Sequence, residues 1–405
     1  MMVQDISMNL SGGRQFLNIP GPTIVPDEVM QAMLRPAIDI YGGEIIGITD
    51  HCLERLKSIF KTKGRTYIYI SNGHGAWEAA LTNTLSRGDK ILVLEGGRFP
   101  TLWAEMANQI GIEVEFLKGD WRCAVNADAV ENRLREDKRG EIKAVLVVHV
   151  DTASGVVNDI PAIRAAMDRA GTHALYMVDA IASLATMPFE MDEWGVDVAI
   201  TASQKGLMMT PGLGLVAAGQ KAIEAHKTAG LRTGYWDWTS RDGAAHYQKY
   251  CGTPPIHLLF GLDRSLKMIM DQGLKIIFDR HRAMAAAVHA AVEQWSKAGI
   301  LEFNILNPVE RAPSVTTILM NGGYDPEALR VMCREQCNVI LGSGMGNLSR
   351  NSFRIAHMGH VNAPTILGSL AITEAALRAL NIPCGDGGIG AATSVISRAL
   401  NSSGR

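Results

Sequence analysis

The sequence predicts an α/β protein built on a mostly parallel, doubly wound sheet and completed by a smaller α+β domain. Short apolar runs alternate with helical patterns between residues 65 and 218, and repeated strand–helix units build parallel sheets. The chain has 405 residues, more than one hydrophobic core normally supports, so two domains are expected. We expect a large domain over 16–265, a small domain over 266–384 and a tail over 385–405, with residues 1–30 contacting the small domain.

The elements of the large domain follow from uninterrupted apolar or β-branched runs and from helical spacing. Strands are expected at 65–70, 90–94, 114–117, 144–149, 176–178, 198–202 and 215–218, the last as an antiparallel edge. Helices are expected at 26–34, 50–60, 76–85, 102–109, 128–136 and 160–169. The stretch 36–49 is rich in glycine and the stretch 227–255 in glycine, tyrosine and tryptophan, and both predict irregular structure.

A long helical pattern over 255–296 carries one apolar face and predicts a helix that bridges the two domains. Beyond it, the small domain is expected to hold strands at 315–319, 339–341 and 352–357 and helices at 324–337 and 365–380. The tail from Pro383 has few large apolar residues, which predicts light packing.

Composition excludes several classes of function. The formal net charge is −2 and no basic stripe occurs, so neither a nucleic-acid nor a membrane partner is expected. The six cysteines are scattered without a CxxC pair, which indicates a reducing compartment. Cys333 and Cys337 could share a helix face, but no second ligand pair follows, so no metal is expected. With no signal peptide and no membrane-spanning apolar stretch in the sequence, we expect a cytoplasmic protein.

The stretch 174–206 carries the chemistry. Ala174 to Val178 is continuously apolar and ends in Asp179, and a second such run, from Val196 to Ser203, is followed by Lys205. Ligands bind at the carboxyl ends of strands in open α/β sheets, so Asp179 and Lys205 are expected in one crevice. Pyridoxal phosphate needs a lysine for its aldehyde and a carboxylate for its pyridine nitrogen. The same pair is also compatible with a structural salt bridge.

A glycine turn, Ser71-Asn72-Gly73-His74-Gly75, follows the strand 65–70 and opens a helix. Such a turn lets backbone N–H groups approach an anion at the positive end of the helix dipole. Because glycine turns join many strands to helices, this pattern alone is not specific for phosphate.

These features together resemble the class V, fold-type I pyridoxal-phosphate aminotransferases, in the group of serine–glyoxylate and alanine–glyoxylate aminotransferases. The resemblance extends from Pro20 to about Leu380 and is strongest at Ser203-Gln204-Lys205-Gly206 and at Asp179 in Val178-Asp179-Ala180. It implies a large domain with a sheet of the seven-stranded type, Lys205 and Asp179 as catalytic residues, and pyridoxal 5′-phosphate as cofactor.

The resemblance also implies roles for single residues. Gly73 and His74 match the phosphate turn, Phe99 the aromatic residue that stacks on the ring, and Thr152 the hydroxyl near the ring oxygen; Gln204 adjoins the lysine. Phe99 is equally compatible with core packing, and Thr152 with a turn cap.

Further resemblances concern the substrate and the partner subunit. Tyr250 and Thr253 match a pair that reaches the phosphate of the neighbouring subunit, which implies a homodimer with shared active sites. Arg354 matches the arginine that forks onto the substrate carboxylate, and Gly21 and Tyr41 are further expected substrate contacts.

The expected function is ping-pong transfer of an amino group from a small amino acid, such as serine or alanine, to a 2-oxo acid such as glyoxylate or pyruvate, through a Schiff base on Lys205. The family usually carries a basic, hydroxyl-bearing stretch where this chain has Asp39-Ile40-Tyr41-Gly42, so the donor stays open. The alternatives are an aspartate–glyoxylate or a pyridoxamine–pyruvate aminotransferase. A lyase or desulfurase of the same fold is disfavoured because the loop 341–346 has no cysteine.

Overall fold

The computed structural model describes residues 10–402. They form two compact units, the larger made of Gly21–Asp279 with Ile305–Ala312 and the smaller of the remaining described residues. The division falls between Asp279 and Arg280, inside helix α10 (Leu274–Trp295), and not at the expected 265/266 boundary. Residues 266–279 therefore belong to the larger unit.

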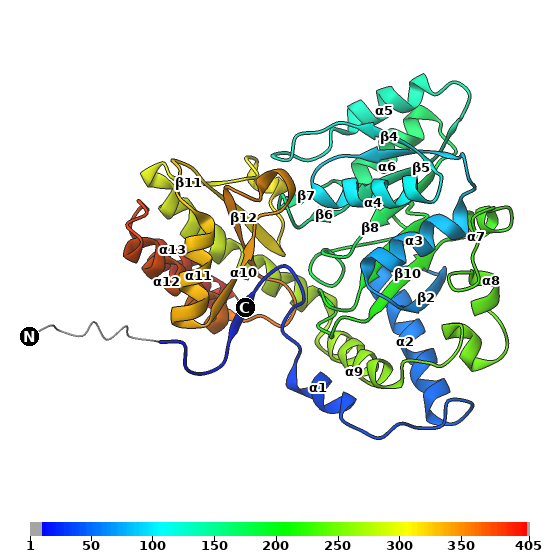
Figure 1. Ribbon diagram of the computed structural model, residues 1–405, viewed down its shortest axis with the longest axis horizontal. Helices are drawn as coiled ribbons and strands as arrows, with labels where there is room; N and C mark the ends of the chain where they lie inside the picture. The colour runs from blue at the N-terminus through cyan, green and yellow to red at the C-terminus, as the bar shows by residue number, and fades with distance from the viewer. Residues whose placement is uncertain (1–9, 403–405) are drawn as a thin grey trace, which may run out of the picture. The chain divides into compact units, whose positions relative to one another are not determined.

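A seven-stranded sheet forms the centre of the larger unit (Figure 1). In sheet order its strands are β2 (Arg65–Ile70), β10 (Leu213–Ala218), β9 (Val198–Ala202), β8 (Leu175–Asp179), β5 (Ile142–Val148), β3 (Lys90–Leu94) and β4 (Glu113–Leu117). The strands from β9 to β4 are parallel, as expected. A separate antiparallel pair is formed by β6 (Val150–Asp151) and β7 (Val156–Val157).

The expectation that β10 is an edge strand was wrong. β10 is antiparallel to both neighbours, as the sequence suggested, but it lies between β2 and β9. Every residue of β10 is buried, whereas Arg65 and Ile70 at the ends of β2 are exposed. The fully apolar run Leu213–Ala218 therefore suits an interior position better than an edge.

Helices cover both faces of this sheet. The helices of the larger unit are α1 (Asp27–Met33), α2 (Glu44–Phe60), α3 (Gly73–Thr84), α4 (Arg98–Gln109), α5 (Ala127–Glu136), α6 (Ile160–Ala170), α7 (Gln220–His226), α8 (Trp238–Arg241) and α9 (Ile256–Gln272), with 3-10 turns η1 (His246–Tyr250) and η3 (Pro308–Glu310). In β5, Val145 and Val147 pack in one apolar cluster with α2, α5, α6 and α9, while Ala144 and Leu146 pack in another with α3, α4 and α7. This alternation makes the sheet doubly wound, as predicted.

Two helices differ from the expectation. α2 begins at Glu44, because Ile45 and Ile48 extend its buried apolar face into the stretch expected to be irregular. The long helix expected over 255–296 is divided into α9 and α10 by Gly273, whose φ of +83° ends α9. A left-handed backbone of this kind favours glycine and cannot continue a helix.

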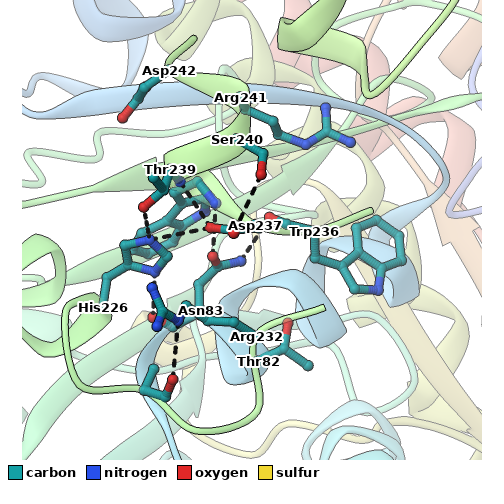
Figure 2. A network of polar contacts seen from close by, with 12 residues as sticks. Thr82, Asn83, His226, Arg232, Trp236, Asp237, Thr239, Ser240, Arg241 and Asp242 are labelled. Atoms are coloured by element: carbon teal, nitrogen blue, oxygen red, sulfur yellow. Dashed lines mark hydrogen bonds and ion pairs between the residues drawn. The ribbon is translucent and has the colours of Figure 1, made fainter. Parts of the chain in front are cut away.

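The segment after α7 is attached to the C-terminal end of α3 by a buried polar network (Figure 2). The Asn83 side chain accepts from Trp238 N at 2.9 Å and donates to Trp236 O at 2.8 Å. His226 contacts the Asn83 carbonyl at 3.0 Å and the Thr239 hydroxyl at 2.9 Å. The segment expected to be irregular is therefore ordered by side-chain contacts and includes the short α8 and η1.

The smaller unit contains a five-stranded sheet. In sheet order its strands are β1 (Phe16–Asn18), β13 (Val339–Ser343), β14 (Ser352–Ala356), β12 (Val315–Met320) and β11 (Leu301–Phe303). Its helices are α11 (Pro326–Cys337), α12 (Ala363–Ala379) and α13 (Gly388–Ser402), besides the end of α10 and the turns η2 (Ser296–Ala298) and η4 (Gly346–Leu348). β1 pairs in parallel with β13 and so brings the N-terminal segment into this sheet.

The tail is more tightly packed than its composition predicted. Ala392 and Ile396 of α13 are buried in the apolar core of the smaller unit. Trp295 Nε1 donates to Glu374 Oε2 at 2.9 Å, and the same oxygen accepts from Ile389 N at the start of α13. Alanine and isoleucine at helical spacing thus suffice for a docked helix. Across residues 10–402, no helix has the length and hydropathy needed to cross a bilayer.

Candidate active site

A cavity of about 200 Å³ lies at the carboxyl ends of β5, β8 and β9, beside the start of α3. It is lined by Asn72, Gly73, His74, Trp77, Phe99, Val148, Val150, Thr152, Asp179, Ile181, Ala182, Gln204 and Lys205. The expected cofactor residues Gly73, His74, Phe99, Thr152, Asp179, Gln204 and Lys205 are therefore brought together. A larger cavity of about 330 Å³ lies elsewhere, along β2, and its lining includes neither Asp179 nor Lys205.

Lys205 follows β9 and is packed against the turn around Gly21. Thr23 N donates to Gln204 O at 3.0 Å, and the Thr23 hydroxyl donates to Lys205 O at 3.0 Å. Gly21 has a φ of +101°, and a Cβ there would lie 2.5 Å from Lys205 Nζ. Gly21, expected as a substrate contact, is thus placed against the lysine side chain.

Asp179 is the last residue of β8, and its side chain is buried. Asp179 Oδ1 accepts from Ile181 N at 2.7 Å, and Oδ2 accepts from Trp77 Nε1 at 2.8 Å. Burial raises the pKa of Asp179 to about 7, although these two hydrogen bonds and the Lys205 charge act in the opposite direction. The carboxyl group is therefore oriented by two donors in a site that disfavours an isolated negative charge.

The start of α3 forms the polar end of the cavity. The Asn72 side chain caps the helix by accepting from His74 N at 3.0 Å and Gly75 N at 3.3 Å. An anion bound here would share or replace this cap at the positive end of the helix dipole. The chain also packs tightly at Gly73, where a Cβ would lie 2.4 Å from Ile181 Cδ1.

Gln204 offers a further polar group to the cavity. Its Oε1 atom is buried and has no hydrogen-bond partner in the described chain. A side-chain amide can present either its oxygen or its NH₂ group after rotation, so Gln204 can serve an anion as a donor. A partly buried amide of this kind fits a site that receives a polar ligand.

The apolar part of the cavity is suited to a flat ring. Phe99 is partly buried, and its N–H donates to the buried Asp151 Oδ2 at 2.8 Å. Asp151 Oδ1 also accepts from Ala153 N and Ser154 N, both at 2.9 Å, which orders the turn that carries Thr152. Gly97 permits this arrangement, because a Cβ there would lie 2.0 Å from Asp151 Cγ.

Tyr250, Thr253 and Tyr41, which belong to the same unit as this cavity, do not line it. Tyr250 is buried in its own chain, where its hydroxyl contacts the Thr49 hydroxyl at 2.8 Å. Thr253 is exposed, and Tyr41 is 76% exposed. Arg354 lies in the smaller unit on β14, where it is buried and its Nε donates to Ser343 O at 2.6 Å.

Sequence reasoning missed Trp77, Asn72 and Asp151. The signal available for Trp77 was its place three residues after His74, since residues at this spacing share one face of a helix. Asn72 stands at the position where helix caps are favoured. For Asp151 the sequence carried no signal that distinguishes a buried turn-former from a surface acid.

The chain is similar to known class V aminotransferases. A family model for class V aminotransferases matches residues 16–350. The L-aspartate–glyoxylate aminotransferase of Paracoccus denitrificans is 38% identical over 369 residues, covering 90% of this chain and 91% of the relative. The serine–glyoxylate aminotransferase of Methylorubrum extorquens is 37% identical over 371 residues, again covering 90% and 91%.

Among solved structures, the ureidoglycine–glyoxylate aminotransferase of Bacillus subtilis superposes with a TM-score of 0.86 at 27% identity. The superposition covers 96% of this chain and 99% of that structure. Both units are therefore included in the similarity.

Proposed function

Because the chain belongs to the class V aminotransferase family and is a transaminase, we propose that it uses pyridoxal 5′-phosphate to move an amino group from a small amino acid to a 2-oxo acid. The observation that carries this proposal is the shared cavity of Lys205 and Asp179, at the ends of two adjacent parallel strands. An amine and a buried carboxyl group in one crevice are the two groups that the cofactor requires.

The residues present fit this cofactor. The start of α3 and Gln204 would hold its phosphate, Phe99 and the apolar lining its ring, and Asp179 its ring nitrogen. When bound, pyridoxal phosphate supplies an aldehyde that condenses with amines and a ring that accepts electrons.

Lys205 has two tasks in this proposal. Its Nζ would anchor the cofactor and, once released from it, would remove a proton from the substrate and return it one position away. Gly21 bears on both tasks, because its missing side chain leaves room for Lys205 Nζ.

Asp179 would hold a proton on the ring nitrogen by its negative charge. Burial raises the pKa of Asp179 to about 7, which means that the site disfavours an isolated negative charge. A cationic partner at close range would stabilise the ionised carboxylate. The apolar surroundings that raise this pKa also strengthen the attraction between the two charges.

Glyoxylate is the acceptor that the relatives support best, with pyruvate as a further 2-oxo acid. Three similar proteins are named for glyoxylate, and they differ in the donor, which is aspartate, serine or ureidoglycine. We propose a small donor such as serine or alanine, with aspartate–glyoxylate and pyridoxamine–pyruvate transfer as alternatives. Arg354 would bind the substrate carboxylate through its guanidinium.

The proposed assembly is a homodimer with shared active sites. Thr253 is exposed and is therefore available to a partner subunit, whereas Tyr250 is buried and bonded to Thr49 in its own chain. Within this proposal Thr253 carries the contact to the neighbouring phosphate. Sedimentation analysis tests the assembly, and a stable monomer with full activity would contradict it.

A matrix of donors and acceptors tests the reaction. Serine, aspartate and pyridoxamine are each combined with glyoxylate and with pyruvate, alanine is combined with glyoxylate alone because its transfer to pyruvate gives no net change, and the amino product is measured by chromatography. Formation of glycine or alanine by the wild type, and not by Lys205→Ala, is expected. Release of sulfide from cysteine without any amino transfer would instead indicate a lyase and overturn the proposal.

A further inference from the structure

Trp77 occupies a central place in the cavity. It lies on α3, is fully buried and lines the cavity together with Asp179. Its indole N–H donates to Asp179 Oδ2 at 2.8 Å. Since Ile181 N holds the other carboxylate oxygen at 2.7 Å, the two donors together fix the plane of the carboxylate.

The same indole contacts the aromatic side chains of the cavity. Its ring centroid lies 4.4 Å from that of His74 and 6.3 Å from that of Phe99, the latter in an edge-on arrangement. His74 and Trp77 are three residues apart on one helix, the spacing at which side chains on a helix meet. One side chain thus touches the polar, the aromatic and the acidic part of the cavity.

We infer that Trp77 is a positioning residue of the transamination site, whose indole N–H favours the ionised form of the Asp179 carboxyl group and orients it toward the ring-binding part of the cavity. This inference rests on the proposed role of Asp179 toward the cofactor. Its physical basis is that a hydrogen bond donated to a carboxylate favours the charged form, and that such a bond is strong in a buried site.

Burial and hydrogen bonding act on the Asp179 carboxyl group in opposite directions. Burial alone disfavours the Asp179 carboxylate, and the N–H groups of Ile181 and Trp77 counteract this. Ile181 contributes through its backbone N–H, which only a substitution by proline would remove. Trp77 is therefore the donor that can be changed without altering the backbone. Without it, Asp179 would bind a proton more readily and would lose one of its two orienting contacts.

A purely structural role is the alternative, because buried tryptophans are common in protein cores. Trp103 offers a matched control for that role. It is also fully buried and stacks on Trp77 at 5.8 Å with an interplanar angle of 15°. Its Nε1 has no hydrogen-bond partner in the described chain, so Trp103→Phe removes similar packing without removing a bond to Asp179.

The experiment measures the pKa of Asp179 in cofactor-free protein by ¹³C NMR of labelled aspartate carboxyl groups, with Asp179→Asn to assign the signal. Loss of a hydrogen bond to a charged group should raise the pKa in Trp77→Phe by roughly 1 or more, while Trp103→Phe should leave it near the wild-type value. Equal pKa values in the wild type and Trp77→Phe would overturn the inference.

A second variant keeps the test valid if Trp77→Phe does not fold. In β-(3-benzothienyl)alanine a sulfur atom replaces the indole N–H while the ring shape is kept, so its incorporation at position 77 should raise the Asp179 pKa as Trp77→Phe does. An unchanged pKa in this variant would also overturn the inference. Binding of pyridoxal phosphate by the wild type is measured in a separate experiment. A wild-type protein that does not bind it would refute the proposed function, whereas the titration of Asp179 is measured without cofactor and would still test the role of Trp77.

Discussion

The Gly21 backbone lies against the side chain of Lys205, at a distance where a Cβ would stand 2.5 Å from Nζ and 2.6 Å from Cε. The backbone at Gly21 has a φ of +101°, which L side chains rarely adopt. Gly21 is therefore required for two reasons: its backbone conformation favours glycine, and a side chain there would collide with Lys205.

We expect Gly21→Ala to displace Lys205 and to lower kcat/KM for transamination by roughly a hundredfold, the scale of loss for a misplaced reactive group. Gly88→Ala is the control, because Gly88 has a φ of +85° and open space around its Cβ position. It should lose about 1–2 kcal/mol of stability through backbone strain and keep its activity. Equal activities in the two variants would contradict this account of Gly21.

Asp179 should make the stability of the cofactor-free protein depend on pH. Its pKa of about 7 in the folded state exceeds the ordinary value of about 3.9, so the folded protein holds the proton more tightly than the unfolded chain. The contribution of Asp179 to stability therefore falls as pH rises from about 4 to 7 and is constant above that. The charges of Lys205 and Asp151 act on the group in opposite directions.

Asp179→Asn removes this titration. The variant should gain stability relative to the wild type between pH 4 and pH 7, by up to about 4 kcal/mol, measured from thermal midpoints of the cofactor-free proteins. Asp128→Asn, at an exposed position on α5, is the control for removing a carboxyl group outside the cavity. A constant stability difference between Asp179→Asn and the wild type would contradict the raised pKa of Asp179.

The network around Asn83 should stabilise the larger unit. Asn83→Leu keeps the branched shape of the side chain but leaves Trp238 N without its partner and Trp236 O with the Tyr69 hydroxyl alone. A buried group left unpaired costs about 1–3 kcal/mol. The midpoint of urea unfolding should fall while its slope is kept. Asn108→Leu, exposed on α4, should change stability by about 0.5 kcal/mol or less, and a similar effect of both substitutions would argue against the network.

Arg354→Ala should weaken the binding of amino acids and 2-oxo acids. Removing a charged group from a buried bidentate contact costs about 2–5 kcal/mol, so kcat/KM should fall roughly thirtyfold or more. With pyridoxamine as donor only the acceptor half-reaction should suffer, because that donor has no carboxylate. Arg350→Ala, at an exposed position of the same unit, should leave kcat/KM unchanged, and a matching loss there would point to a general effect of charge.

Much of the fold could be predicted from local sequence patterns, in which residues close together in the chain determine a strand or a helix. The continuous apolar runs before Asp179 and Lys205 identified two buried parallel strands, and their common end located the cavity. The interior place of β10 could not be predicted, because an apolar run does not reveal which strands pair with it. The break at Gly273 was missed because the apolar face continues on both sides of the glycine.

The site could be predicted only in part, because some of its contacts join residues that are far apart in the sequence. Gly73, His74, Asp179 and Lys205 stand at the ends of elements, where sequence patterns are informative. The bond from Trp77 to Asp179 joins residues 102 positions apart, and its donor sits on a helix with many other apolar residues. The buried position of Tyr250 likewise depends on Thr49, which lies 201 positions away.

Covalent labelling of Lys205 tests the central claim most directly. The protein is incubated with pyridoxal phosphate, treated with borohydride, digested and analysed by mass spectrometry. Our account predicts a stable phosphopyridoxyl adduct on the peptide that contains Lys205, in wild type and not in Lys205→Ala. An adduct confined to other lysines, or none at all under conditions where the wild type transaminates, would contradict it.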